Sequence, residues 1–543
     1  MTTALVRVHF DIPYQLDGVA CLKYVGAGLV VDAAIGLVLV DRNTIPVIPG
    51  DVRVEFASTV SVPAIVRFLH PTHNLAFVQY DPSTLTGEPV VSATLSPEAL
   101  EVGQDCTFVG LSKIDAAALP VFQPCVVRES CIIDAGLPSI PRYRAVNEEI
   151  IRFDLGMALE DTVGGVFVDE EGHVKALWAA YATATHDEEL YEQFEGMPIG
   201  AAIALRDALA RGDGSVLNSP PPPWQQPLGS PAPGAAGKAA DGEGDEGAVE
   251  GALHFLDAEL RPVSLATACG IAEGSGLGLT REWAERLAST DTEKRQALLV
   301  QRLAAPMKPK RVAARQAADA DADAVTAPAS AAAAKAGEAG TAGKEGKEAD
   351  AADAADAAAL AGCLHEGDLL LAVDGVPVST FRAVEECVRS QPATTLTLLR
   401  DGVERSIETR CSRVASDGTV HVVMWCGLVL QPAYRAVLER GFEPPQGGVY
   451  ISYYLFGSPA HKHKLVPKHW VIEVNGAVVS GMRSFVGLIE KLHHGESCRV
   501  KTVDLAGRTS AYTVKTDHAY WRSYEVVRKD GKWVQRVLGE PKA

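Results

Sequence analysis

The chain has 543 residues, of which 47% are hydrophobic and 22% are charged. This length and composition predict several folded domains and exclude a wholly disordered protein. The 69 acidic and 50 basic side chains give a formal net charge of −19, so we expect no nucleic-acid partner, because such a surface repels phosphate backbones. No apolar segment is long enough to span a bilayer, and the N-terminal sequence MTTALVRVHFDIPY has the pattern of a strand, not of a signal peptide.

The ten cysteines are scattered, mostly within apolar runs, and no two of them form a Cys-x-x-Cys pair. This usage is typical of buried thiols in a reducing compartment, rather than of a disulfide framework or a zinc site. The histidines near the C-terminus, at positions 461, 463, 469, 493 and 494, lack the carboxylate or cysteine spacing of a metal site. We therefore expect neither a metal nor another cofactor.

The first 210 residues consist of short apolar, β-branched runs separated by turn residues. The runs cover residues 5–10, 29–31, 37–40, 52–56, 64–69, 75–80, 106–111, 150–153 and 166–168. Many short strands at such spacing predict an all-β barrel or sandwich. Apolar residues three and four apart in IGAAIALRDALAR then predict a helix at 199–211, which closes this block.

Two segments have compositions that cannot bury enough apolar surface to fold. Residues 212–251 contain PPPPWQQP and an acidic Gly/Ala stretch, which predicts a linker. Residues 306–358 consist mainly of Ala, Asp, Lys and Glu and present no large apolar face, which predicts a disordered insertion.

An internal repeat fills the C-terminal half. The sequence GDLLLAVDGVPVS at 367–379 matches KHWVIEVNGAVVS at 468–480, an offset of 101 residues. Each copy has an apolar strand, an Asp-Gly or Asn-Gly turn and a short second strand, and a helical stretch and another strand follow. We infer two related modules, one at 252–415 that contains the insertion and one at 416–535, with a tail at 536–543.

The second module carries a strand, a Gly-Ser-Pro-Ala turn and a short helix ahead of its repeat, in the sequence GVYISYYLFGSPAHKHKL. This order resembles a PDZ domain of the Deg/HtrA, or protease Do-like, family. The resemblance places four residues where backbone amides would hold the terminal carboxylate of a peptide, namely Gly427, Leu428, Val429 and Leu430. Phe485 and Leu488 would line the groove beside the helix, or serve only as core positions. The segment at 258–303 resembles the corresponding part of the long Do-like proteases of plants and fungi.

The N-terminal block resembles the chymotrypsin-like double β-barrel of the same family. GAGLVV at 26–31 and GLVLVDRNTI at 36–45 resemble the two strands that lead to the catalytic histidine. HNLAFV at 73–78 resembles the segment with the catalytic aspartate, and DTVGGV at 161–166 resembles the Gly-Asn-Ser-Gly-Gly-Pro motif around the nucleophile. The resemblance implies a mainly β, multi-domain chain, with a degenerate trypsin-like protease domain at 1–211 and then two PDZ-like α+β domains.

Under this resemblance all three catalytic positions are substituted. Asn43 stands at the position of the general base, Asn74 at that of the orienting aspartate and Val163 at that of the nucleophile. Triad catalysis needs an oxygen nucleophile, a basic imidazole and a carboxylate that orients it. A valine has no lone pair, and an asparagine has no useful basicity near neutral pH. We therefore interpret the barrel as a pseudoprotease with no catalytic residue.

Neighbouring residues offer a relocated site as the alternative. Thr162 adjoins the nucleophile position, and His70 and His73 lie close to Asn74 in the sequence. Adjacent strand residues point to opposite faces, so Thr162 would not inherit the direction of the nucleophile. Asp161 replaces the family's glycine, where its carboxylate would either repel the charge that acyl transfer develops or simply face water.

The leading hypothesis is a non-catalytic Deg/HtrA-type module for protein quality control. It would scaffold a homo-oligomer or a hetero-oligomer with an active Deg protease, or recruit unfolded or C-terminal peptides of damaged proteins. One alternative is an active ATP-independent serine endopeptidase, through a relocated site or a catalytic half missing from the gene model. Another is a pure PDZ adaptor that binds peptides. The resemblance implies the chloroplast stroma or the nucleus, and no targeting peptide is visible.

Overall fold

The computed structural model of the chain describes residues 2–19, 21–85, 87, 90–113, 119–155, 159–184, 190–212, 252–270, 276–303, 363–529 and 532–539. Apart from Gly212, the expected linker at 212–251 lies outside these residues, and so does the expected insertion at 306–358. The chain forms two compact units. Unit 1 combines Met1–His254 with Arg413–Ala543, and unit 2 is Phe255–Ser412.

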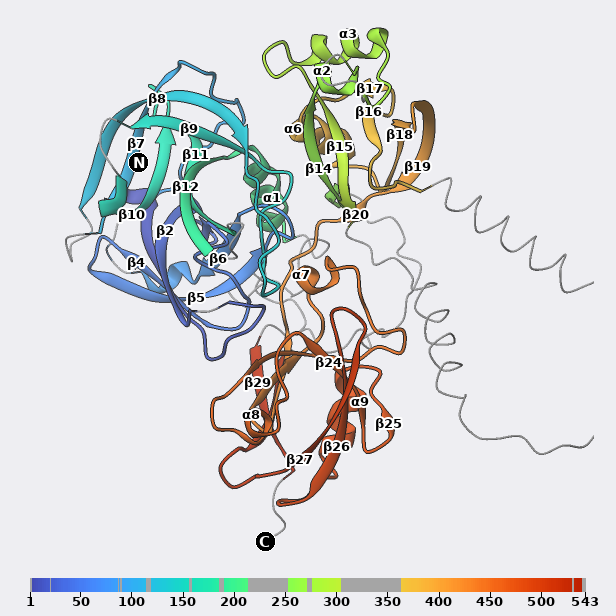
Figure 1. The fold of residues 1–543 in the computed structure, drawn as a ribbon. Coiled ribbons are helices and arrows are strands. Elements are labelled where there is room, and N and C mark those ends of the chain that lie inside the picture. Colours follow the sequence, from blue (N-terminus) through green and yellow to red (C-terminus); the bar gives the residue numbers. More distant parts are fainter. Residues whose placement is uncertain are drawn as a thin grey trace, which may run out of the picture. The chain divides into compact units, whose positions relative to one another are not determined.

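Unit 1 begins with a closed six-stranded barrel, drawn in blue in Figure 1, with the strand order β1-β2-β3-β6-β5-β4. Its strands are β1 (Leu5–Asp11), β2 (Lys23–Asp32), β3 (Leu37–Val40), β4 (Asp51–Phe56), β5 (Val60–Leu69) and β6 (Ala76–Tyr80). Two 3-10 turns flank the barrel, η1 (Thr2–Ala4) and η2 (Pro82–Thr84). The β-branched residues that predict strands also fill the barrel, because alternate side chains of each strand point inward and are buried there.

A second closed barrel follows, with the strand order β10-β11-β12-β9-β8-β7. Its elements are β7 (Asp105–Ser112), β8 (Pro120–Ile132), β9 (Glu149–Leu155), η3 (Leu159–Asp161), β10 (Thr162–Val168), β11 (Val174–Ala184), β12 (Leu190–Pro198) and helix α1 (Gly200–Ala210). Aromatic rings fill its interior: Phe153 and Phe167 stack with ring centroids 3.6 Å apart, and Trp178 meets Phe167 edge to face. The two barrels confirm the predicted chymotrypsin-like double barrel.

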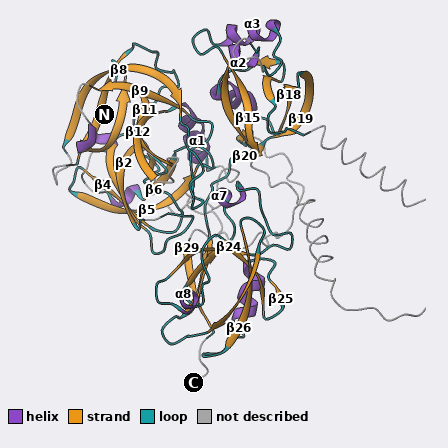
Figure 2. Ribbon diagram, in the orientation of Figure 1, coloured by secondary structure: helices purple, strands orange, loops and turns teal. Residues whose placement is uncertain are grey.

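The C-terminal part of unit 1 is a nine-stranded sheet with the order β27-β26-β24-β23-β22-β21-β28-β29, and β25 pairs with β24. Its strands are β21 (His421–Trp425), β22 (Leu428–Gln431), β23 (Val449–Tyr454), β24 (His469–Val474), β25 (Ala477–Val478), β26 (Ser497–Asp504), β27 (Thr509–Lys515), β28 (Ser523–Lys529) and β29 (Lys532–Leu538). Its helices are α7 (Arg435–Leu438), α8 (Pro459–Lys462) and α9 (Met482–Ile489). Figure 2 shows how far strands outweigh helices. No described helix has the length and apolar composition needed to cross a membrane.

The C-terminal sheet and the first barrel share one hydrophobic core. Val422, Met424 and Val429 of the sheet belong to the same buried cluster as the residues inside the barrel. A buried hydrogen bond also joins the two parts, because the hydroxyl of Thr419 donates to Asp17 Oδ1 at 2.5 Å. The second module is therefore packed as part of the same folded body as the protease-like domain, whereas the sequence suggests separate domains.

Unit 2 contains a sheet with the order β14-β15-β16-β18-β19, and β17 pairs with β16. Its strands are β14 (Ala258–Ser264), β15 (Gln296–Leu303), β16 (Leu369–Val373), β17 (Val376–Pro377), β18 (Ala393–Arg400) and β19 (Val403–Arg410). Its helices are α2 (Leu265–Ala268), α3 (Arg281–Thr290) and α6 (Phe381–Val388). Short strands β13 (His254–Phe255) and β20 (Ser412–Arg413) lie at its two ends in the sequence.

The internal repeat has the same structure in both copies. A two-residue turn with positive φ at both positions joins β16 to β17 and β24 to β25. The first turn residue then reaches the next long strand: Asp374 Oδ1 accepts the N–H of Thr395, and Asn475 Oδ1 accepts the N–H of Arg499, each at 2.8 Å. The Asp-Gly and Asn-Gly signals thus mark a shared hairpin and its side-chain anchor.

Strand β29 runs past residue 536, where the sequence predicts the start of the tail, and ends at Leu538, which is 2% exposed. The strand extends because β29 pairs with β28, which itself pairs with β21, so the last residues complete the sheet.

Candidate functional site

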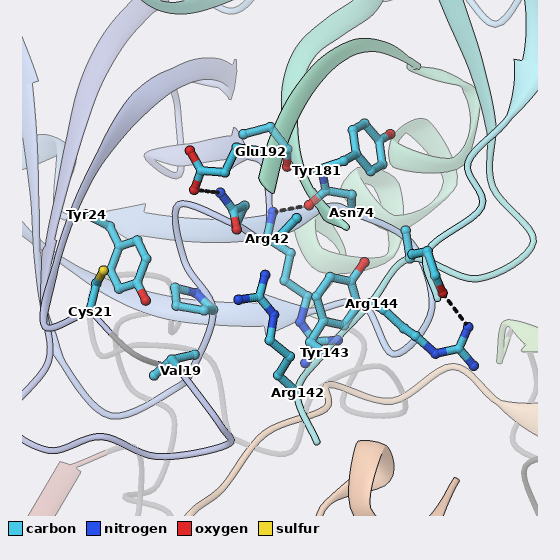
Figure 3. A pocket seen from close by; sticks show the side chains of 16 residues that line it. Val19, Cys21, Tyr24, Arg42, Asn74, Arg142, Tyr143, Arg144, Tyr181 and Glu192 are labelled. Carbon is cyan, nitrogen blue, oxygen red and sulfur yellow. Dashed lines mark hydrogen bonds between the residues drawn. The ribbon is translucent and has the colours of Figure 1, made fainter. Parts of the chain in front are cut away.

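The three substituted triad positions meet at a cleft lined by residues of both barrels. Asn43 follows β3 and Val163 lies at the start of β10, and both line this cleft of about 710 Å³. Asn74 precedes β6 and lines, together with Asn43, an adjoining pocket of about 310 Å³ (Figure 3). Residues far apart in the sequence therefore line these two adjoining cavities.

Asn74 is part of the internal framework of the double barrel. It is 1% exposed, its Nδ2 donates to the carbonyl of Ala180 on β11 at 2.8 Å, and its Oδ1 accepts the N–H of Arg42 at 3.0 Å. Its own N–H donates to the carboxylate of Glu148 at 2.9 Å. Both halves of the amide are used, so an asparagine at this position ties the first barrel to the second.

Asn43 and Val163 offer no chemistry for acyl transfer. The Nδ2 of Asn43 donates to Oε1 of Glu192 at 3.2 Å, and an amide cannot take a proton near neutral pH. Val163 is half-buried and carries only methyl groups. The cleft thus lacks a base and a nucleophile at the two positions where the family has them.

The neighbours of Val163 do not replace it. The hydroxyl of Thr162 donates to the carbonyl of Leu159 at 2.7 Å, so its proton is committed to the backbone rather than to a base. Asp161 is exposed, which favours the interpretation that its carboxylate faces water.

The two nearby histidines are buried away from the cleft. His70 and His73 stack with ring centroids 4.5 Å apart, and neither lines the cleft or the pocket. Nδ1 of His70 accepts the N–H of His73 at 2.8 Å and lies 3.4 Å from the hydroxyl of Thr72, which is also buried. Burial, with the nearby charges of His73 and Arg42, lowers the pKa of His70 well below its ordinary value. The imidazole of His70 is therefore structural and stays neutral near pH 7.

The cleft itself contains the imidazole of His9, on β1. Its Nε2 lies 3.0 Å from Oε2 of Glu55. Cys21, Thr44 and Thr162 line the same cleft, but among the residues that the structure describes none of them hydrogen-bonds to His9. Within the described part of the chain, the cleft therefore has no pair of nucleophile and imidazole.

Asp41 shapes the turn that carries Asn43. Its Oδ1 accepts the N–H of Thr44 at 2.6 Å. Burial raises the pKa of Asp41 to about 6, although this hydrogen bond opposes the rise. The carboxyl of Asp41 caps the local backbone, and its pKa is raised because the side chain is buried.

Sequence reasoning missed several residues that line the pocket. Arg142 and Tyr143 come from the loop between β8 and β9, and Glu192 comes from β12. None of them belongs to a recognisable motif, and only the closure of the second barrel brings them beside Asn43. A cluster of basic residues in PRYRAV was the available signal.

The second predicted site, the carboxylate-binding loop, is a tight hairpin turn. β21 pairs with β22 so that Trp425 lies opposite Leu428, and Cys426 and Gly427 form a two-residue turn with φ of 51° and 80°. The other edge of β22 pairs with β23. Because the chain itself occupies both edges of β22, an added peptide strand would have to displace β21. Peptide binding at this loop stays a prediction.

The side chains of the predicted peptide-binding residues are mostly buried. In the predicted carboxylate loop, three residues are at most 1% exposed, namely Leu428, Val429 and Leu430. Phe485 on α9 is fully buried and meets Trp425 edge to face, with ring centroids 5.7 Å apart. Leu488 packs against the same core and is half-buried. These contacts favour the alternative that the residues are core positions.

One group among the described residues has the proximity of metal ligands. The ligand atoms of Asp169, Glu171 and His173, in the hairpin between β10 and β11, lie within 4.8 Å of one another. Nζ of Lys175 lies 3.4 Å from Oδ2 of Asp169. The lysine already supplies the positive charge that a cation would bring, so this group does not indicate a metal site.

Comparison with known proteins shows relatives along nearly the whole chain. Protease Do-like 7 of Arabidopsis thaliana is 28% identical over 545 residues, which cover 96% of this chain and 42% of that protein. The pro-apoptotic serine protease nma111 of Neosartorya fischeri is 25% identical over 97% of this chain and 42% of its own length. The chain therefore spans less than half the length of these relatives. No family model matches the chain.

Solved structures of HtrA-type proteases align with the chain at low identity. The HtrA-type protease AlgWS227A with a tripeptide aligns with 76% of this chain and 95% of its own, at 13% identity and a TM-score of 0.40. The crystal structure of Deg5 aligns with 39% of this chain and 91% of its own, at 17% identity and a TM-score of 0.27.

Two observations agree on the family. The similarity to the curated relatives extends through both units, and two closed six-stranded barrels lie where the sequence resemblance places the protease domain. Along nearly its whole length the chain is similar to proteins of the Deg/HtrA, or protease Do-like, family, and it has the chymotrypsin-like double barrel that the sequence resemblance predicts.

Proposed function

We propose that this chain is a non-catalytic module of the Deg/HtrA type, a pseudoprotease that keeps the fold of its relatives without their chemistry. One observation carries the proposal: Asn43 and Val163 line the cleft and Asn74 lines the adjoining pocket, and the resemblance assigns these three residues to the triad positions. None of these side chains can attack a carbonyl or move a proton at neutral pH. In a serine protease the loss of the triad costs about a million-fold in turnover.

The substituted residues have structural roles, which supports the proposal. The amide of Asn74 joins the two barrels, and the amide of Asn43 holds Glu192 at the rim of the pocket. The hydrogen bond of Asn74 is buried, so its loss would leave a polar group unpaired and destabilise the fold.

A scaffold is the role that suits this architecture. The first barrel and the C-terminal sheet share one hydrophobic core, so unit 1 can bind a partner as one rigid unit. We propose that this surface assembles an oligomer, with copies of the chain or with an active Deg protease. In protein quality control, such an assembly would hold unfolded or C-terminal peptides of damaged proteins for that protease.

A second function, ATP-independent serine endopeptidase, is favoured by the names of the relatives. Both are called proteases, and the chain spans only 42% of each. In that case the catalytic groups would belong to sequence that this chain does not include, and the present region would still act as the scaffold.

The compartment is a further part of the proposal. The cysteines are free thiols, which suits a reducing compartment. The family resemblance implies the chloroplast stroma or the nucleus.

Casein hydrolysis tests the proposed function. The purified chain is expected to release fragments from fluorescent casein no faster than buffer without protein does. Thr162→Ala is expected to leave this rate unchanged, because no described groups in the cleft can act as nucleophile and base. Trypsin serves as the positive control for the substrate. Fragment release that Thr162→Ala abolishes would reveal a relocated nucleophile and would refute the proposal.

A further inference from the structure

The pocket of Figure 3 contains three guanidinium groups, and two of them have a fixed counter-ion. Arg42 pairs with Asp417 at 2.7 Å, and Arg144 lies 3.5 Å from the carboxylate of Glu439. Among the residues that the structure describes, no carboxylate lies within 4.0 Å of the guanidinium of Arg142, and no hydrogen bond satisfies it. Arg142 therefore brings a positive charge to the pocket without a matched anion.

The position of Arg142 makes this charge consequential. Its side chain is half-buried and in Figure 3 reaches into the pocket, toward the space between Tyr24 and Tyr143. Burial lowers the pKa of Arg142, and the nearby groups of Tyr24 and Glu192 oppose this. An arginine remains charged under such conditions, since its ordinary pKa lies above 12. Because a guanidinium in this position has lost part of its hydration, the binding of an anion to it lowers the free energy.

The pocket is open to the cleft where the family places its substrate. Cleft and pocket share five lining residues, namely Cys21, Tyr24, Asn43, Ala180 and Glu192. The pocket volume of about 310 Å³ accommodates one side chain, whereas the cleft, at about 710 Å³, accommodates a longer segment. An extended peptide in the cleft can therefore place one of its groups in the pocket.

We propose that the pocket binds a carboxylate of an extended peptide lying in the cleft, with Arg142 as its ionic partner. The planar fork of a guanidinium matches the two oxygens of a carboxylate, which favours this anion. The carboxylate comes either from an Asp or Glu side chain or from the peptide C-terminus. This inference rests on the proposed function, because the peptide is held there without being cut.

Glu192 sets the geometry of this recognition. It is exposed, and its carboxylate accepts a hydrogen bond from Asn43 at the rim. Water screens its charge there, while the guanidinium of Arg142 lies deeper. A carboxylate that enters the pocket therefore passes Glu192 and pairs with Arg142. Salt weakens both the repulsion by Glu192 and the attraction to Arg142.

Fluorescence anisotropy with labelled peptides tests the inference. The probes are fluorescein-Val-Ala-Glu-Val-Ala-amide, the same peptide with Gln in place of Glu, and the Gln peptide with a free C-terminal carboxylate. We expect the full chain to bind the Glu peptide about tenfold more tightly than the Gln amide. If the free-acid Gln peptide also gains about tenfold, the terminal carboxylate is a source as well; if it does not, the side chain is the ligand.

Three variants separate the charge of Arg142 from the fold. Arg142→Met is expected to remove the preference for the Glu peptide, Arg142→Lys to keep part of it, and Arg128→Met, on the exposed face of β8, to leave it unchanged. Equal affinity for all three peptides, no binding of any of them, or a carboxylate preference that survives Arg142→Met would overturn the inference. The intact mass of each peptide after incubation keeps the two proposals apart: cleavage refutes the proposed function, whereas loss of charge preference refutes only the carboxylate site.

Discussion

Asn74→Asp, which restores the acid of the family's triad, is expected to lower the free energy of unfolding of unit 1 by about 3 kcal/mol. Asn74 is 1% exposed, and its Nδ2 donates to the carbonyl of Ala180 at 2.8 Å. An aspartate would place a carboxylate oxygen against that carbonyl at a buried position. The carboxylate of Glu148, which accepts the backbone N–H of residue 74 at 2.9 Å, adds a like charge nearby.

Urea unfolding at pH 8 and at pH 5 measures this loss. The loss is expected to shrink at pH 5, because burial raises the pKa of the new carboxyl and its protonated form can donate to Ala180 again. Asn43→Asp is the matched control, since the same change at a partly exposed position is expected to cost at most about 1 kcal/mol. An Asn74→Asp chain as stable as its parent at both pH values would show that the amide has no structural role.

Gly427→Ala is expected to lower the free energy of unfolding by about 3 kcal/mol, because the turn between β21 and β22 has no room for a side chain at this position. Gly427 has φ of 80°, and a Cβ there would collide with the side chain of Ser458. The turn is also clamped: the N–H of Leu455 donates to the carbonyl of Gly427 at 2.7 Å, and that of Ala460 to the carbonyl of Cys426 at 3.1 Å. The collision and the unfavourable φ add to the cost.

Gly476→Ala is the matched control for this prediction. Gly476 occupies the same place in the turn between β24 and β25, with φ of 83°, but a Cβ there would meet nothing within 4 Å. Its replacement is therefore expected to cost about 1 kcal/mol, from φ alone. Urea unfolding followed by tryptophan fluorescence compares the two variants. Equal losses would mean that the turn at Gly427 is open, as a peptide-binding loop would be.

Local sequence signals were sufficient for the elements of the barrels and the repeat. Strand β3 (Leu37–Val40) has the predicted limits, and helix α1 (Gly200–Ala210) differs from the prediction by one residue at each end. These elements follow from β-branched runs, helical spacing and Asp-Gly or Asn-Gly turns, all of which act between neighbouring residues. The family resemblance then supplied the order of the barrels and the positions of Asn43, Asn74 and Val163.

The remaining features depend on pairings between distant residues. β21 pairs with β28, about a hundred residues further along the chain, so the last two strands extend the sheet beyond β21. The shared core of the barrel and the sheet is equally non-local, because Met424 and Val429 read as ordinary core residues of their own module. No local pattern distinguishes an apolar residue that faces its own domain from one that faces another.

The same reason hides the pocket chemistry. Arg142 looks like a surface residue of a Pro- and Arg-containing loop, and only the folded barrel shows it half-buried beside Asn43 and Asn74. The family motifs mark only the three substituted triad positions. They carry no information about the arginines that line the neighbouring pocket.

Labelling with a fluorophosphonate probe tests the central claim of a non-catalytic barrel most directly. This reagent forms a covalent adduct only with an activated hydroxyl, and intact-mass spectrometry of the purified chain counts the adducts. We predict no adduct on the native chain, at any pH from 6 to 9, and no difference between native and heat-denatured samples. A stoichiometric adduct that forms on the native chain and not on the denatured one would contradict the account.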